Sequence, residues 1–413
     1  MSSKSEMENS MAPTNEKVNK YIPNDLAFSV LSKLSLKSLK RFECVCKSWT
    51  LLFENPNFVS MYRNNFISSH ISNYDDTSLL LQEIISPFTK EEYSMFYLLS
   101  GERFENKVKL DLPPPFYEDG YDIKILGSGS INGTLCLTQR NTPFVLWNPA
   151  NEEFKVIPLS PIEFVPPYPA HFWDRLGFGY DHIRDDYKVI RNVGFYPLIE
   201  STYYSLLQVK QPWNWEDLSD DPIWELYSLR SNSWKKLDAN TPRDIWEIKC
   251  DQIYMDGICH WWGGEQPEII KEYLVSFDLI DEVFFTTPMP SYMDKKFYSG
   301  LVHLVMLNGS VAFISNYAET TPLHISILGE PGVKESWTKL YIVDLLPSVE
   351  RPPIEAGNKG IILFKREIEG KRLSWFDLNS QMIEEFDADI DGKWNRNIVI
   401  YKKNLIPTEG LND

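Results

Sequence analysis

Residues 130–158 read SINGTLCLTQRNTPFVLWNPANEEFKVIP and carry turn and strand signals in a fixed order. Asn132-Gly133 predicts a tight hairpin turn, because both residues accept a positive φ at low cost. An alternating apolar run follows, and a second run ends in Leu146-Trp147-Asn148. A polar turn, an aromatic residue and a proline complete the unit. The stretch therefore predicts short antiparallel strands joined by tight turns.

The same order of signals recurs along most of the chain. Residues 254–290 contain Asp256-Gly257, then Ser276-Phe277-Asp278, then Phe284 and Pro290. Further units begin at 308–309 and 358–360, and residues 176–193 with 224–237 make another. The glycines at 133, 179, 257, 309 and 360 are separated by 46, 78, 52 and 51 residues. A period near fifty, with one unit stretched by an insertion, is typical of four-stranded propeller blades.

The two ends of this β region predict a shared closing blade. Strands are expected at 78–84 and 95–112, and the run NIVIYKKNLI at 397–406 supplies another. Closure from both ends would remove exposed sheet edges that otherwise aggregate. Five units and this composite predict a six-bladed, all-β propeller-like domain over 75–405, followed by a tail at 406–413. A twisted β-sandwich is the alternative.

A different pattern precedes this domain. After a polar leader at 1–18, expected to be disordered, residues 21–66 show helical periodicity. Pro23 suits a first helical turn, and Ser35 can cap a second helix. One apolar stripe consists of Leu26, Val30, Leu31 and Leu34, and the next of Leu36, Leu39, Phe42, Val45 and Cys46. A unit this small buries little surface by itself, so one face is expected to pack on another protein. The alternative is that both faces pack on the following domain.

Composition limits which classes of partner and which cellular compartment are expected. The 413 residues include 41 Lys and Arg against 58 Asp and Glu, a formal net charge of −17 that argues against nucleic acid as a partner. The five cysteines, at 44, 46, 136, 250 and 259, have neither metal-ligand nor disulfide spacing. No apolar run approaches the ~18 residues of a membrane span. A soluble protein of the cytoplasm, the nucleus or both is expected, without membrane association.

Catalytic and cofactor motifs are not found in the sequence. The histidines at 171, 182, 260, 303 and 324 are dispersed, and Cys259-His260 is a lone pair on an apolar run. GSGSING at 127–133 lacks the following helix and Lys-Ser/Thr of a phosphate loop. The carboxylates at 185–186 and 217–221 could bind a cation, although solvated loops are commoner. We expect no catalytic residue, metal site or cofactor.

The helical stretch resembles an F-box. The resemblance rests on the leucine stripe after Ile22-Pro23, on VCKSW at 45–49 and on Pro-Asn-Phe at 56–58. Ser35 departs from the family, which usually has proline there, but serine is a competent helix cap. The resemblance places the F-box at 19–66. It implies an α+β multidomain protein in which a small helical unit precedes the β domain.

Residues 75–405 resemble the F-box-associated domain of the plant family that includes kelch-like and S-locus F-box proteins. The segments that carry the resemblance are LWNP (146–149), GFGYD (177–181), DDYKV (185–189), LYSLRSNSW (226–234), DGICHWW (256–262), VSFDLIDEVF (275–284) and ESWTKL (335–340). The kelch double glycine is not repeated faithfully. Propeller geometry therefore follows less directly than family membership.

The resemblance implies a non-catalytic substrate receptor of a Skp–cullin–F-box ubiquitin ligase. The F-box would bind a Skp-type adaptor, and through it cullin, while the β domain captures a protein target. The adaptor-binding residues would be Pro23, Leu26, Leu31, Leu34, Leu36, Leu39, Arg41, Val45, Cys46, Lys47 and Trp49. A glycan-binding lectin-like F-box protein and an S-locus-type factor that recognises a ribonuclease are alternatives. A propeller enzyme is disfavoured, because no nucleophile–base pair or set of metal ligands can be named.

Two long irregular stretches, 160–175 and 195–222, are the candidate target-binding loops. They contain large aromatic side chains in Pro-rich or acidic surroundings, a composition typical of contact hot spots. The residues are Tyr168, Phe172, Trp173, Trp213 and Trp215. The alternative is that these side chains fold back on the domain as plugs.

Overall fold

A computed structural model describes one helix and 26 strands of the chain. The described residues are 24–34, 38, 41, 51, 55, 58, 61, 77–85, 93–101, 104–114, 116, 123–139, 143–161, 171–172, 176–195, 223–237, 247–248, 252–264, 272–289, 302–316, 322–333, 336–343, 355–356, 360–367, 371–386, 396–404 and 410–411. Helix α1 (Asn24–Leu31) ends in a tight turn in which Ser32 N donates to Phe28 O at 2.9 Å.

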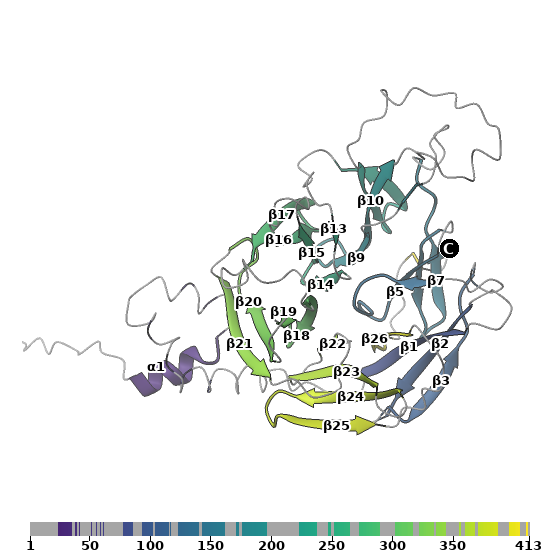
Figure 1. Ribbon diagram of the computed structural model, residues 1–413. Coiled ribbons are helices and arrows are strands. Elements are labelled where there is room, and N and C mark those ends of the chain that lie inside the picture. Colours follow the sequence, from purple (N-terminus) through teal and green to yellow (C-terminus); the bar gives the residue numbers. More distant parts are fainter. Residues whose placement is uncertain are drawn as a thin grey trace, which may run out of the picture.

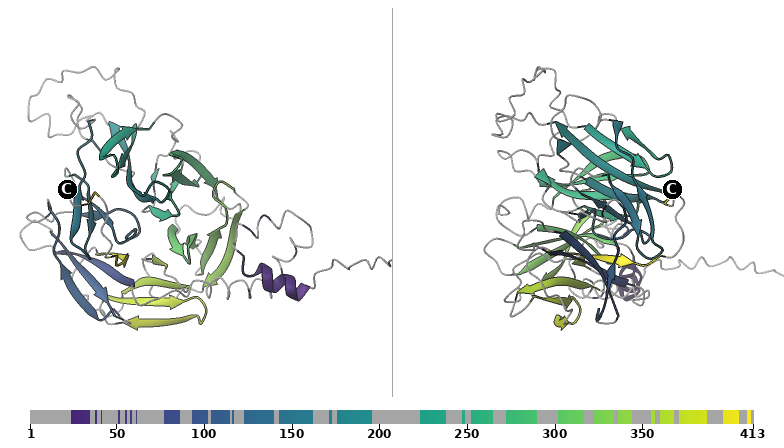
Figure 2. Two further views of the ribbon diagram at one scale, coloured as in Figure 1. Left: turned by 180° about the vertical axis from the view of Figure 1, so that it is seen from behind. Right: turned by 90° about the vertical axis from the view of Figure 1, so that its right-hand side faces the viewer.

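The described strands form six antiparallel sheets arranged in a ring (Figures 1 and 2). Blade 1 contains β26 (Arg396–Lys402), β1 (Thr77–Ile85), β2 (Tyr93–Ser100) and β3 (Asn106–Leu110), in that spatial order. Blade 2 contains β4 (Lys124–Ile125), β5 (Leu135–Thr138), β6 (Val145–Asn148) and β7 (Glu153–Val156). Blade 3 contains β8 (His171–Phe172), β9 (Leu176–Asp181), β10 (Asp186–Phe195), β11 (Ile223–Ser228) and β12 (Ser233–Lys236).

The other three blades complete the ring. Blade 4 contains β13 (Glu247–Ile248), β14 (Ile253–Met255), β15 (Ile258–Gly264), β16 (Glu272–Asp278) and β17 (Val283–Pro288). Blade 5 contains β18 (Val302–Leu307), β19 (Ser310–Asn316), β20 (Leu323–Leu328) and β21 (Trp337–Val343). Blade 6 contains β22 (Glu355–Ala356), β23 (Ile361–Glu367), β24 (Lys371–Asp377) and β25 (Met382–Phe386).

Every blade has four strand positions. In blade 3, β8 and β9 pair with different parts of the same edge of β10, so they form one interrupted strand. In blade 4, β13 and β14 share an edge of β15 in the same way. Six such sheets in a ring confirm the six-bladed propeller and exclude the two packed layers of a β-sandwich.

The predicted composite blade is confirmed. Strand β26 pairs with β1 over seven residues, from Thr77 opposite Lys402 to Glu83 opposite Arg396. Asn397 Nδ2 also donates to Gln82 Oε1 at 3.2 Å, joining residues 315 positions apart. Early and late parts of the β region therefore close the ring together.

Three of the expected glycine turns have the predicted backbone. Positive φ values occur at Asn132 and Gly133 (50° and 82°), at Asp256 and Gly257 (48° and 85°), and at Asn308 and Gly309 (47° and 68°). Two consecutive left-handed residues are the signature of the type I′ turn, which matches the twist of a hairpin.

Gly179 does not mark a fourth such turn. It lies inside β9, and a Cβ added there would lie 2.2 Å from Leu279 Cδ1 and 2.9 Å from Tyr254 Cδ2 of blade 4. The glycine therefore permits close contact between blades. The corresponding turn of blade 3 runs from Asp181 to Asp185, whose φ is 54°.

Outer-strand tryptophans hydrogen bond to proline carbonyls of the preceding blade. Pro158 is the predicted proline of its unit, whereas in blade 4 the acceptor is Pro288 and the predicted Pro290 lies outside the described residues. Trp234 Nε1, on the outer strand of blade 3, donates to Pro158 O after blade 2 at 2.7 Å. Trp337 Nε1, on the outer strand of blade 5, donates to Pro288 O of blade 4 at 3.2 Å. Apolar cores also fill the spaces between sheets, as where Trp262 stacks on Phe313 at 4.5 Å.

The antiparallel order gives the propeller two unlike ends. Connections from the first strand position to the second, and from the third to the fourth, lie at one end, here called the tight-turn end. All other connections lie at the opposite, long-connection end. They are 86–92, 111–123, 139–144, 157–170, 196–222, 237–246, 265–271, 289–301, 317–322, 344–354, 368–370 and 387–395. Because β1 begins and β26 ends at the tight-turn end, the helical segment joins the propeller there.

Candidate functional site

The helical segment packs on the propeller through part of its apolar surface. Leu31 and Phe58 are 5% and 1% exposed and belong to one core cluster with residues of blades 5 and 6. Phe28 meets Phe58 edge-on, with ring centroids 5.5 Å apart. Ala27, Phe28 and Leu34 are half-buried against the same cluster. One face of the helical segment thus contributes to the interior of its own chain.

A second apolar face of α1 is exposed. Leu26 and Val30, four residues apart, are 58% and 56% exposed. Residues at i and i+4 lie on the same side of a helix, so Leu26 and Val30 form one exposed strip. One face of the helical segment thus packs on the following domain and another is open to solvent, so the alternative in which both faces pack on that domain does not hold for Leu26 and Val30.

Four of the eleven residues expected to bind the adaptor lie within the described part of the chain. Leu26 is exposed and Leu34 is half-buried. Leu31 is buried in the core shared with blades 5 and 6, so its side chain anchors the helix on the propeller. Arg41, itself 65% exposed, forms an ion pair of 3.0 Å with Glu330 of blade 5. The residues outside the described part are Pro23, Leu36, Leu39, Val45, Cys46, Lys47 and Trp49.

The predicted target-binding aromatics fall largely outside the described residues, but their connections can be placed. Phe172 lies in β8, where its backbone pairs with Gly194, whereas Tyr168, Trp173, Trp213 and Trp215 are not described. Connection 157–170 enters blade 3 and connection 196–222 joins β10 to β11 of that blade. The topology thus brings both to the long-connection end of one blade.

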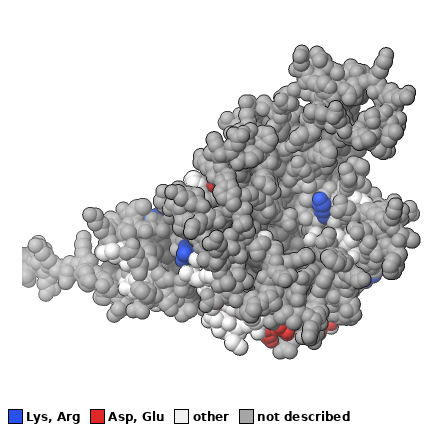
Figure 3. Space-filling model, in the orientation of Figure 1, with Lys and Arg blue, Asp and Glu red and all other residues white. Residues whose placement is uncertain are grey.

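The excess negative charge of the chain is concentrated at the same end. The twelve long connections contain 24 Asp and Glu against 9 Lys and Arg, which gives −15 of the total −17. On the face drawn in Figure 3, the described Lys and Arg side chains form separate spots. Most of the formal negative charge of the sequence therefore belongs to connections that begin and end at the long-connection end.

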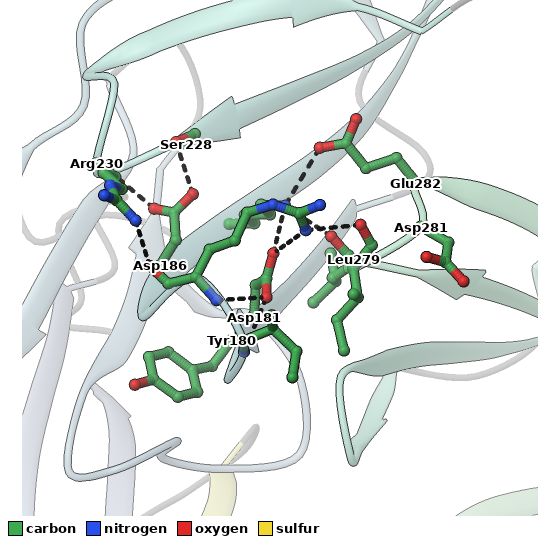
Figure 4. Close-up of polar contacts among 12 residues, drawn as sticks. Tyr180, Asp181, Asp186, Ser228, Arg230, Leu279, Asp281 and Glu282 are labelled. Carbon is green, nitrogen blue, oxygen red and sulfur yellow. Dashed lines mark hydrogen bonds and ion pairs between the residues drawn. The ribbon is translucent and has the colours of Figure 1, made fainter.

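Sequence reasoning missed a buried polar joint between blades 3 and 4 (Figure 4). Lys188 Nζ of β10 donates to Asp181 Oδ2 at 2.9 Å, to Leu279 O at 2.6 Å and to Glu282 Oε1 at 3.2 Å. Its side chain is 3% exposed and that of Asp181 is 0% exposed. Arg184 Nη1 adds bonds to Asp181 Oδ2 at 2.8 Å and to Ile280 O at 2.7 Å.

The joint holds Asp181 in its charged form. Burial alone would raise the pKa of Asp181, but the hydrogen bonds from Arg184 and Lys188 outweigh it and lower the pKa to about 2. Lys188 and Arg184 both also bond to backbone carbonyls of the 278–282 turn, at Leu279 and Ile280. The contacts connect one blade to the next, so we assign them a structural role.

Burial shifts the pKa values of His260 and of the two described cysteines. His260 Nδ1 pairs with Ser276 Oγ at 2.8 Å, and burial lowers the His260 pKa to about 3, so the ring is neutral. Burial also raises the pKa of the Cys136 and Cys259 thiols. Across the described residues, no group of three or more His, Cys, Asp or Glu is placed to hold a metal ion. Within that same part of the chain, no helix has the length and apolar character needed to cross a membrane.

Comparison with known proteins identifies both regions. The family profile described as the F-box associated beta propeller domain matches residues 85–408, and that of the F-box domain matches residues 21–60. The Arabidopsis thaliana protein At3g16210, which carries an F-box name, is 32% identical over 285 residues, covering 67% of this chain and 62% of that protein. F-box protein CPR1 of the same plant is 24% identical and covers 87% of this chain and 83% of its own length.

Among solved structures, an oligogalacturonate lyase in complex with manganese has a TM-score of 0.40 at 10% identity, covering 73% of each chain. That likeness is too low to suggest a shared activity. The profile of the β-propeller spans most of the chain, the F-box profile precedes it, and the six-bladed ring agrees with both. The chain is therefore a plant F-box protein with an F-box-associated β-propeller domain.

Proposed function

We propose that the protein is the substrate receptor of a Skp–cullin–F-box ubiquitin ligase. F-box proteins in general have this role. Here the F-box binds a Skp-type adaptor, and through it cullin, and the propeller captures a protein target. The receptor is non-catalytic, since ubiquitin transfer is carried out by separate components, and it acts in the cytoplasm, the nucleus or both.

The division of the apolar surface of the helical segment carries this proposal. Leu31 and Phe58 are used inside the chain, whereas Leu26 and Val30 remain exposed although they lie on a helix that is already anchored. Exposed apolar side chains on an ordered helix are a common basis for a docking face. The seven expected adaptor residues outside the described part would extend this face.

The target is captured at the long-connection end. The connections that begin and end there are strongly acidic in sequence, and two of them contain Tyr168, Trp213 and Trp215. The helical segment joins the propeller at the opposite end. Because the helical segment and the long connections lie at opposite ends of the propeller, an adaptor and a target can bind at the same time without a steric clash. The charge supports a target with a Lys- and Arg-rich surface, whose association would be steered electrostatically.

Adaptor capture tests the first half of the proposal. Wild-type chain co-expressed with a Skp-type adaptor should co-purify with it, and Leu26→Asp plus Val30→Asp should weaken binding at least tenfold. Leu36→Ala plus Leu39→Ala should do the same. Met382→Asp, at a 66% exposed position of blade 6 away from this helix, controls for added charge. Wild-type binding by both double variants would overturn the adaptor assignment.

Proximity labelling under proteasome inhibition tests the second half. Labelled proteins that accumulate with the wild type, and not with a chain lacking residues 19–66, are candidate targets. The proposal expects a protein that is ubiquitinated in a receptor-dependent manner and binds less tightly as salt rises. Glycan-array binding without protein capture would instead support the lectin-like alternative, and capture of a ribonuclease would support the S-locus alternative.

A further inference from the structure

The segment that follows β26 crosses from the closing blade to blade 2. Lys402 N, at the end of β26, donates to Ser130 Oγ at 2.9 Å, and Ser130 N donates back to Ile400 O at 3.0 Å. Gly129 forms a parallel bridge with Ile400. The end of blade 1 is therefore fixed to the segment that leads into the first turn of blade 2.

Asn404 then contacts two turns of blade 2 at the tight-turn end. Its backbone oxygen accepts from Asn148 Nδ2 at 2.9 Å, and its Nδ2 donates to Asn132 O at 2.9 Å. The approach is close, because a Cβ added to Gly133 would lie 2.6 Å from Asn404 Cβ. Asn132 and Asn148 belong to the two turns that define this end of the blade.

Leu411 packs between blades 2 and 3. It is 0% exposed and lies in a core cluster with Cys136, Leu146 and Ile157 of the blade 2 region and Tyr187, Val189 and Leu229 of blade 3. Gly410 has a φ of +89° and lies against Leu229, so the backbone turns there into the core. Leu411 is therefore part of the core, although the sequence predicted a tail at 406–413.

We propose that the described residues after β26, at 403–404 and 410–411, act as a strap that holds the closing blade against blades 2 and 3. Pairing of β26 with β1 closes the ring, and the strap holds the seam between blades 1 and 2 shut from the tight-turn end. Asn404 supplies the polar attachment, and Leu411 anchors the far end of the strap. Release of the strap would loosen this seam while leaving blades 5 and 6 unchanged.

Hydrogen exchange of the full chain, resolved by peptide, tests the strap. Leu411→Asp should speed exchange at the seam, at the amides of Ser130 and Lys402, at least tenfold, with little change in blades 5 and 6. Asn404→Ala should give a smaller change at the same amides and keeps the test valid if Leu411→Asp fails to fold. Met382→Asp, at a 66% exposed position of blade 6, is the matched control.

Two results would overturn the proposal. In the first, both variants exchange at the wild-type rate at Ser130 and Lys402. In the second, exchange rises equally in all six blades, which would make Leu411 an ordinary core residue and Asn404 a surface contact.

Discussion

The two ends of the propeller are built from different chemistry. At the tight-turn end, Asn132, Asp256 and Asn308 adopt left-handed conformations in short turns, and Asp181, Asp278 and Asp377 accept hydrogen bonds from the backbone of their own turns. At the opposite end, twelve longer connections carry most of the excess negative charge of the sequence and three of the five predicted contact aromatics, Tyr168, Trp213 and Trp215. The difference suggests that stability and recognition are assigned to opposite ends, as in other folds where loops on a rigid scaffold carry function.

Loss of the buried lysine between blades 3 and 4 should give the largest effect. Lys188→Met leaves Asp181 buried with one cation removed, and breaking a buried pair in this way costs about 3–5 kcal/mol of unfolding free energy. Chemical denaturation measures it. Lys235→Met is the control, because Lys235 also bonds to Glu282 but is 52% exposed, and loss of an exposed pair costs at most about 1 kcal/mol. Equal losses in the two variants would contradict the interpretation.

Gly179→Ala should come next. The new methyl group would overlap Leu279 and Tyr254 across the blade joint, and overpacking of this kind costs about 1–3 kcal/mol. The double variant Gly179→Ala plus Leu279→Ala should destabilise less than the sum of the single variants, because the smaller side chain relieves the overlap. Strict additivity in thermal or denaturant unfolding would show that Gly179 is not a contact position.

Acidification should weaken the tight-turn end and its neighbouring core in two stages. His260 has a folded-state pKa lowered by burial to about 3, so its contribution is complete above its unfolded pKa of about 6.5 and is lost as pH falls toward 3. Asp181 has a pKa lowered to about 2. Its contribution is complete above the unfolded pKa of about 3.9 and is lost as pH falls toward 2.

The two stages can be separated by substitution. In denaturant titrations from pH 7 to pH 2, His260→Gln should flatten the dependence of the unfolding free energy mainly above pH 4. Asp181→Asn should flatten it mainly below pH 4. A wild-type slope in either variant over its own range would refute the assignment of that group.

At the long-connection end the smallest stability effect is expected. Trp213→Ala plus Trp215→Ala should change the unfolding free energy by no more than about 0.5 kcal/mol, as for substitutions away from a packed core. Capture of the target should nevertheless fall at least tenfold, because aromatic residues dominate contact energies. If the variant is strongly destabilised, these residues are plugs rather than contacts, and the division between the ends fails there.

The repeat could be predicted because its information is local. Asn132-Gly133, Asp256-Gly257 and Asn308-Gly309 specify their own turns through backbone preference, and the aromatic and proline recur at regular distances. Six blades and the composite closure followed from these signals. Gly179 was misinterpreted as a mark of the period, since only its contact with Leu279, a hundred residues further on, explains it.

The functional surfaces could be predicted less completely from the sequence, for a physical reason. The pattern at 26–34 reveals apolar faces, but periodicity does not tell whether a face meets another domain or another protein. The structure separates Leu31 from Leu26 because Leu31 packs in the shared core of blades 5 and 6. The Lys188 joint was missed for a similar reason, since Lys188 and Glu282 are 94 positions apart and each looks like an ordinary charged residue of a strand or turn.

The composite blade also has a consequence for the order of synthesis. Strands β1 to β3 are made early, but the edge of β1 has no partner until β26 follows, more than 300 residues later. At translation rates of roughly 5–20 residues per second, that edge stays open for tens of seconds, exposed to mispairing. Only a chain completed through β26 can close its ring, so a prematurely ended product would keep an open edge that quality control can recognise.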